Sequence, residues 1–112
     1  MACIFCQIAQ QTIPAEFLYD TDKVFVIKDL HPKAKVHLLV IPKLHLATLN
    51  DLTVKSAPVL AEIGLAIQAI TKQSQIDQSG YKVICNNGAD GGQAIPHLHF
   101  HVLGGESIKG VT

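Results

Sequence analysis

Some segments of the chain have apolar residues at helical spacing, and others are short apolar runs typical of strands. Apolar side chains recur every three or four residues in segments 4–10 and 58–72, which predicts one short and one long helix. Pro14 stops the first segment, and Pro58 suits the first turn of the second. Five short apolar segments bounded by turn residues are typical of β-strands: 17–19, 24–28, 36–41, 81–85 and 97–103. Together they predict a single α+β domain over residues 1–112 with a mainly antiparallel five-stranded sheet.

Charge and composition narrow the partners of this domain. Nine Lys residues balance nine acidic residues, and Arg is absent, which argues against a nucleic-acid partner. The longest apolar run, 38–41, is far shorter than the roughly 20 residues of a membrane helix. Three Cys residues form an odd set, and no leader-like segment precedes them, so we expect a cytoplasmic protein without disulfides. Any bound phosphate must be held by backbone amides, His or Lys.

Three of the six His residues stand at alternate positions near the C-terminus. His97, His99 and His101 alternate with apolar residues, and the period of two in a strand places the three imidazoles on one face. Two kinds of chemistry suit such a face. The three imidazoles could hold a catalytic zinc with an open position. Alternatively, one of them could be a nucleophile oriented by its neighbours.

The segment before these histidines is rich in glycine. Loop 86–94 contains three glycines, and Gly91 and Gly92 directly precede Gln93, which would let backbone amides approach an anion closely. A phosphate beside an imidazole face favours nucleophilic attack on phosphorus. Near the N-terminus, the spacing of Cys3 and Cys6 suits half of a zinc site, although packed or simply reduced thiols have the same pattern.

These motifs carry a family resemblance. The run 97–103 resembles the signature of the histidine triad (HIT) nucleotide hydrolases and transferases. Further residues resemble landmarks of that family in the same order, from residue 3 to about residue 105: 3–6, 13–15, Asp29, 37–42 with His45, Asn86 and 91–93. The sequence 103–105, Leu-Gly-Gly, resembles the Hint branch of the family.

The resemblance implies an activity for the histidine face. It implies a HIT-like fold that hydrolyses the P–N bond of purine nucleoside 5′-phosphoramidates, such as adenosine 5′-phosphoramidate, to the nucleoside monophosphate. His99 would attack phosphorus to give a covalent nucleotidyl-histidine, with no metal required for catalysis. His37, His101 and Asn86 would surround the phosphate, and the backbone carbonyl of His97 would orient the nucleophile.

The same resemblance implies a substrate pocket, a metal site and a partner. Asp29 would grip the ribose hydroxyls, and Gly92 would contact the substrate. Apolar walls around the base of AMP or GMP would come from Ile4, Phe5, Ile8, Ile27 and Leu30. A structural zinc would be held by Cys3, Cys6, His45 and His97. The protein would act as a homodimer, with the sheet continued across two subunits.

One position departs from the family pattern and leaves an alternative open. Ala94 stands where the family usually has a Ser or Thr hydroxyl that assists the leaving group, and Gln93 could partly replace it through its amide. The alternative is a nucleotide-binding or regulatory module with little turnover. His31 matches no functional position of the family and is expected to be a surface turn residue.

Overall fold

A computed structural model of the protein describes residues 3–110. Its strands form a single five-stranded sheet in which every neighbouring pair is antiparallel. In spatial order the strands are β1 (Tyr19–Asp20), β2 (Val24–Lys28), β3 (Val36–Pro42), β5 (Phe100–Gly104) and β4 (Tyr81–Ile84). The helices in the described residues are α1 (Ile4–Ala9), α2 (Val59–Gln73) and the 3-10 turn η1 (Leu49–Asp51). The predicted α+β class with an antiparallel five-stranded sheet is confirmed.

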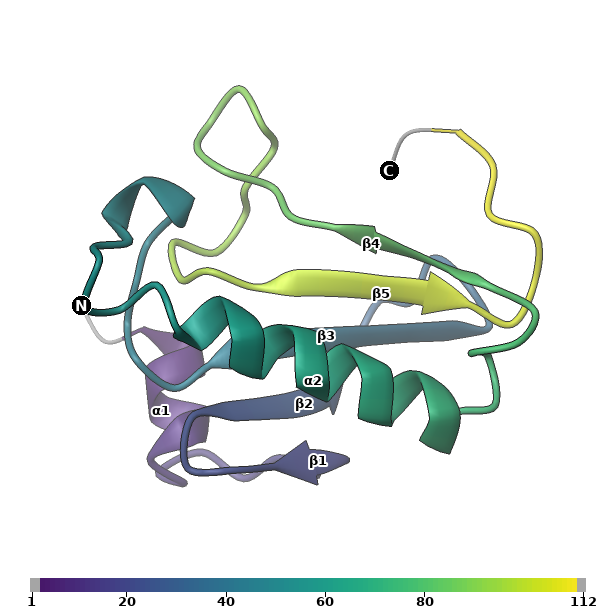
Figure 1. Ribbon diagram of the computed structural model, residues 1–112, viewed down its shortest axis with the longest axis horizontal. Coiled ribbons are helices and arrows are strands. Elements are labelled where there is room, and N and C mark those ends of the chain that lie inside the picture. The colour runs from purple at the N-terminus through teal and green to yellow at the C-terminus, as the bar shows by residue number, and fades with distance from the viewer. Residues whose placement is uncertain (1–2, 111–112) are drawn as a thin grey trace.

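The long helix α2 covers one face of this sheet, as Figure 1 shows. Its apolar residues at helical spacing pack against alternate residues of β2 and β3, because neighbouring side chains of a strand point to opposite faces. The main buried residues of this layer are Val24, Val26, Leu38, Val40, Ile63, Ala66 and Ile70. This layer supplies most of the apolar core.

The short helix α1 packs on the opposite face. Phe5 and Ile8 of α1 are buried against the other set of alternate residues of β2 and β3, which are Phe25, Ile27, Leu39 and Ile41. His37 belongs to this second set, because it is two residues before Leu39. The face covered by α1 is therefore the face that carries the histidines.

The main differences from the expected elements concern β5, β1 and η1. Strand β5 begins at Phe100 and not at residue 97, because the backbone N–H of Leu98 donates to the carbonyl of Leu46 in a loop. The alternation of faces nevertheless continues through this segment, since Leu98 is buried in the α2 layer. Strand β1 lies one residue or more later than predicted, and η1 was not expected. Between residues 3 and 110, no helix has the length and apolar character needed to cross a bilayer.

Candidate active site and metal-ligand cluster

An open cavity of about 650 Å³ lies on the histidine-bearing face of the sheet. This volume is within the usual range for a small-molecule site. Residues from α1, β3, β4, β5 and two loops line it, among them Phe5, Asp29, Lys33, His37, Asn86, Gly92, Ala94, His99 and His101. The structure thus brings together two of the three alternating histidines, His37 and the glycine loop.

The geometry of His99 fixes which ring nitrogen is free. Its Nδ1 lies 2.7 Å from the carbonyl oxygen of His97, and the ring is only 5% exposed. A carbonyl only accepts hydrogen bonds, so Nδ1 carries the proton and Nε2 keeps its lone pair. His99 lines the cavity and therefore offers it a nitrogen nucleophile.

A second pair of imidazoles, His37 and His101, forms a directed hydrogen-bond chain. The backbone N–H of Lys33 donates to Nδ1 of His37 at 3.0 Å, so His37 is neutral and carries its proton on Nε2. Nε2 of His37 lies 3.0 Å from Nδ1 of His101 and 3.3 Å from Oδ2 of Asp29. His101 accepts at Nδ1, and its own proton is therefore on Nε2. We call Asp29, His37 and His101 the relay.

Burial keeps both imidazoles of the relay neutral. It lowers the pKa of His101 to about 4, with further lowering by the nearby His99 and His37. Burial also lowers the pKa of His37, and the charge of Asp29 only partly opposes this effect. At neutral pH, His101 is consequently a neutral N–H donor at the cavity wall.

Two glycines of loop 86–94 are required for different reasons, Gly91 by close packing and Gly92 by its backbone conformation. A Cβ on Gly91 would lie 2.4 Å from the carbonyl oxygen of Asn87, and Gly92 has a φ of +77°. The N–H of Gly92 donates to Ala89 and that of Gln93 donates to Gly88. Both amides are therefore used inside the loop, which corrects the expectation that they are free to hold an anion. Asn86 secures the loop by donating to the Gly91 carbonyl at 2.7 Å.

The side chain of Gln93 bonds to backbone groups of the surrounding loops. Its Nε2 donates to the carbonyls of Ala47 at 2.6 Å and Ile95 at 2.9 Å, and its Oε1 accepts from the N–H of Gly88. The described cavity lining includes Ala94 but not Gln93. The expectation that this amide replaces the missing hydroxyl is therefore corrected, because both of its N–H groups already have acceptors.

Of the apolar residues predicted to surround the base, only one lines the cavity. Phe5 lines it, whereas Ile8 and Ile27 are buried in the core beneath α1. Ile4 is 46% exposed and Leu30 is 88% exposed, and neither is among the described residues that line the cavity. Sequence reasoning missed other wall residues, namely Leu39, Ile84, Ile95 and Leu103. Leu39 in β3 and Leu103 in β5 each follow a histidine of the cavity by two residues, and this spacing could have suggested them.

The mouth of the cavity carries charges that the sequence did not predict. His31, Lys33 and Asp90 are exposed and line it. His31 is an exposed turn residue as expected, but it also belongs to the cavity. Its backbone N–H donates to Oδ1 of Asp29 at 2.8 Å, which fixes the carboxylate that also faces His37.

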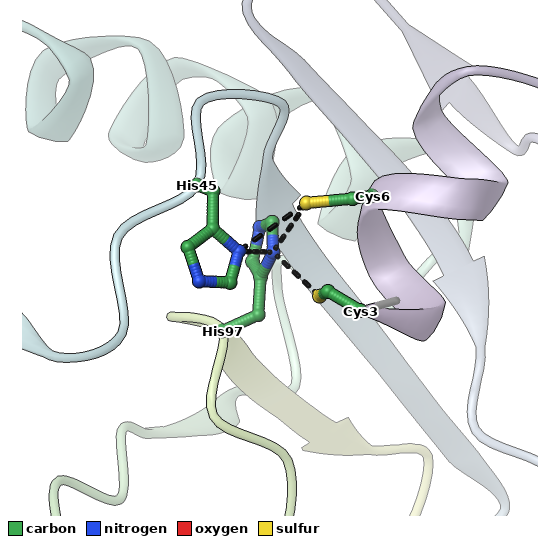
Figure 2. Close-up of side chains that lie close together, drawn as sticks. All are labelled: Cys3, Cys6, His45 and His97. Carbon is green, nitrogen blue, oxygen red and sulfur yellow. Dashed lines mark hydrogen bonds between the residues drawn. The ribbon is translucent and has the colours of Figure 1, made fainter. Parts of the chain in front are cut away.

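A separate cluster of Cys3, Cys6, His45 and His97 lies beside the cavity (Figure 2). Figure 2 shows the two Cys side chains reaching from α1 and its start towards imidazoles from the loop after β3 and the segment before β5. Nδ1 of His97 lies 3.2 Å from Sγ of Cys3, 3.6 Å from Sγ of Cys6 and 3.1 Å from Nδ1 of His45. Sγ of Cys6 is 3.2 Å from Nδ1 of His45. We call these four residues the Cys/His cluster.

The atoms of the Cys/His cluster suit a tetrahedral zinc ion. Ligand atoms of such a site are about 3.3 to 3.8 Å apart, close to the separations seen here. Nε2 of His97 lies 2.8 Å from the Pro42 carbonyl, so it carries the proton and Nδ1 presents its lone pair to the cluster. Burial lowers the pKa of His97, which keeps this ligand neutral, whereas burial and the neighbouring Cys3 raise the pKa of Cys6. A metal must therefore displace the thiol proton of Cys6.

The three alternating histidines, His97, His99 and His101, do not converge on one point as metal ligands would. Candidate ligand groups in residues 3–110 do not include the combination of His97, His99 and His101. His97 faces the Cys/His cluster, and His99 faces the cavity. The relay does form a compact group, but the proton on Nε2 of His37 occupies the position that a metal would need.

Comparisons with known proteins agree with this architecture. The family model of the HIT domain matches residues 10–108. An uncharacterised HIT-like protein of Chlamydia trachomatis is 41% identical over the full length of both chains. The purine nucleoside phosphoramidase of Escherichia coli is 33% identical, covering 94% of this chain and 88% of the relative. A histidine triad protein from Clostridium difficile superposes with a TM-score of 0.94 at 41% identity, covering 100% of this chain and 97% of the other.

Proposed function

Because the chain belongs to the HIT domain family, we propose that it hydrolyses purine nucleoside 5′-phosphoramidates to nucleoside monophosphates. The family includes the E. coli purine nucleoside phosphoramidase, which supports this substrate class. The observation that carries the proposal is the 2.7 Å contact from Nδ1 of His99 to the carbonyl of His97, since it leaves Nε2 free at the cavity.

The proposed reaction uses this nitrogen as a nucleophile. Nε2 of His99 bonds to the α-phosphorus, and the P–N bond to the leaving amine breaks as the amine takes up a proton from solvent water at the open cavity. Nδ1–H of His99 stays bonded to His97, and that carbonyl stabilises the positive charge on the substituted ring. Water then attacks phosphorus, the bond to His99 breaks, and the monophosphate is released. No step requires a metal.

The relay supports the phosphate in this proposal. The N–H at Nε2 of His101 is free to donate to a phosphate oxygen, since Nδ1 is occupied by His37. Asp29 holds His37 and has further lone pairs for the ribose hydroxyls of AMP or GMP. Phe5, Leu39 and Ile95 offer apolar contacts to the base.

A zinc ion would have a structural role. Cys3, Cys6, His45 and His97 would hold it, and its bonds would join α1 to the segments after β3 and before β5. Its coordination would supply a cross-link and leave His99 available for catalysis.

The exposed edge of β4 supports the proposed homodimer. β4 is an end strand of the sheet, and Tyr81 and Val83 are each 41% exposed. Pairing of β4 with a second copy would satisfy its free backbone groups and continue the sheet. Val83→Lys should weaken such a dimer, which light scattering of the wild type and the variant would measure.

The test of the activity is release of AMP from adenosine 5′-phosphoramidate. The wild type should release AMP, and His99→Ala should lose at least about a thousandfold in rate, because the nucleophile is removed. Gln78→Ala, at an exposed position outside the cavity lining, is the control and should retain the wild-type activity. Equal rates for wild type and His99→Ala would rule out His99 as the nucleophile.

Ala94 favours a second candidate, a nucleotide-binding module with little turnover. Ala94 lines the cavity and provides no hydroxyl, and Gln93 has no N–H to spare. Tight AMP binding with undetectable turnover, together with turnover gained in Ala94→Ser, would favour the module. Ready turnover by the wild type with several leaving amines would favour the hydrolase.

A further inference from the structure

His97 is shared between the Cys/His cluster and the cavity. Its ring points into the cluster, with Nδ1 3.2 Å from Cys3 and 3.1 Å from His45. Its backbone carbonyl accepts the 2.7 Å hydrogen bond from His99. The same residue is 0% exposed, so it has little room to adjust one contact without the other. A change in the ring position of His97 is therefore transmitted to the atom that orients His99.

Phe5 makes a second connection between the two regions. It lies in α1 between Cys3 and Cys6 and is only 3% exposed. Its ring packs edge-on against His97, at 5.7 Å between centroids, and against His99, at 5.3 Å. Phe5 also lines the cavity. The helix that carries both thiols of the cluster thus carries part of the cavity wall.

The helix α1 depends on its surroundings for its structure. It has six residues, no side chain caps its first turn, and no acidic residue lies there. Isolated helices shorter than about 12 residues are marginal in water, so α1 is held by what it packs against. Those contacts are the apolar packing of Phe5 and Ile8 and the approach of Cys3 and Cys6 to the two imidazoles. Loss of the second group would allow α1 to loosen and would shift Phe5 from the cavity wall.

We propose that zinc binding at the Cys/His cluster and nucleotide binding in the cavity are thermodynamically linked, each strengthening the other. This inference rests on the proposed function, since it takes the cavity as a nucleotide site. The two states are α1 docked, with Phe5 and the His97 carbonyl in place, and α1 loosened. Zinc binds only the docked state with all four ligands, and the nucleotide prefers the same state because its pocket is complete. Linkage then requires equal factors in both directions.

The experiment measures both affinities on the wild-type protein. Titration calorimetry gives the AMP dissociation constant for zinc-loaded and chelator-treated protein, and competition with a chelator of known affinity gives the zinc constant with and without AMP. We expect zinc to strengthen AMP binding about tenfold, and AMP to strengthen zinc binding by the same factor. Equal AMP affinity in the two forms would overturn the linkage and leave the proposed function standing. Failure of the protein to bind zinc would do the same.

The outcome for the zinc-loaded protein separates the two proposals. If AMP and GMP do not bind to the loaded wild type, the nucleotide site itself is wrong, and both proposals fall. If AMP binds and the affinity depends on zinc, both are supported. The wild-type comparison needs no substitution and therefore does not depend on a variant that folds.

Two substitutions test the route of the coupling. Cys6→Ser should weaken zinc and AMP together, whereas Cys85→Ser should leave both unchanged, because Cys85 lies outside the cluster and the cavity lining. Phe5→Leu should keep zinc affinity within about twofold of the wild type. The factor by which zinc strengthens AMP binding should fall, because the connection through Phe5 is removed and only the connection through His97 remains. Full coupling in Phe5→Leu would contradict the route through α1.

Discussion

Two groups of side chains in this protein each place a pair of imidazole nitrogens about 3 Å apart, yet their chemistry differs. In the Cys/His cluster, His45 and His97 approach to 3.1 Å, and in the relay, His37 and His101 approach to 3.0 Å. The difference lies in the other nitrogen of one ring. For His97 it meets the Pro42 carbonyl, which accepts, and for His37 it meets the Lys33 N–H, which donates.

The partner of that second nitrogen decides what the first can do. The Pro42 carbonyl holds the proton of His97 on Nε2, so Nδ1 presents a lone pair to the cluster, which suits a metal. The Lys33 N–H occupies Nδ1 of His37, so the proton of His37 is on Nε2 and faces His101, which suits hydrogen bonding and proton transfer. Distance alone would not separate these two groups. The following substitutions are chosen to break one group and leave the other intact.

The largest expected effect is the loss of stability when the proposed zinc ion is removed. Chelation, or Cys6→Ser, should lower the free energy of unfolding by about 4 kcal/mol at free zinc about 1,000 times its dissociation constant. Denaturant unfolding with and without zinc measures this change. His101→Gln should respond to zinc as the wild type does, since the relay is separate. A zinc response lost in His101→Gln would show that the metal binds in the relay instead.

The next effect is the dependence of stability on pH. The pKa of His101 is about 4 in the folded protein and about 6.5 when unfolded, so the unfolded chain binds more protons between these values. Stability from this group is fully present above about pH 6.5 and falls as the pH drops towards 4, by at most about 3 kcal/mol. His37 acts in the same direction.

Unfolding curves at pH 4 to 7 measure this slope. In His101→Gln the slope should be shallower than in the wild type, because one depressed imidazole is gone. Gln78→Ala, at an exposed position without an ionisable side chain, should leave the slope unchanged. Identical slopes in the wild type and His101→Gln would contradict the burial of a neutral His101.

A substitution in the relay is expected to affect catalysis, by a smaller free energy than the two effects above. His101→Ala should lower kcat about 100-fold, because the phosphate loses its N–H donor, while the zinc content stays at the wild-type level. Steady-state kinetics and metal analysis of the same sample measure both. An unchanged kcat would remove His101 from the mechanism.

The smallest effect concerns the charge of Lys33. Its ammonium lowers the pKa of both His37 and His101 as a minor contribution after burial. Lys33→Gln should therefore raise the midpoint of the acid-side stability loss by less than about one pH unit, since an exposed charge is screened by water. Lys35→Gln is the control of equal charge. A larger shift in Lys35→Gln would contradict the placement of Lys33 at the cavity.

The alternation of side chains made much of this architecture predictable. The period of two in β2 and β3 and the spacing of apolar residues in α2 depend on local geometry, so the sequence pattern indicates both faces of the sheet. The start of β5 was missed because a loop carbonyl, that of Leu46, takes the hydrogen bond of Leu98. Such long-range pairing leaves no mark in the local pattern.

The site was predictable in its residues but less so in their bonding. The resemblance pointed to Asp29, His37, Asn86, His99 and His101, and the structure brings all five to one cavity. The occupied amide of Gln93 and the proton position of His37 depend on backbone groups of Gly88, Ala47 and Lys33, which sequence spacing does not specify. The resemblance also placed Leu30 in the wall, but its side chain is exposed to solvent.

We expect Nε2 of His99 to become bonded to phosphorus during turnover. Rapid acid-free quenching of the wild type with adenosine 5′-phosphoramidate, followed by proteolysis and mass spectrometry, locates any covalent adduct on the chain. We predict an adenylate on His99 that decays as AMP appears and is absent from His99→Ala. An adenylate on another residue, or AMP release by His99→Ala at the wild-type rate, would contradict the account.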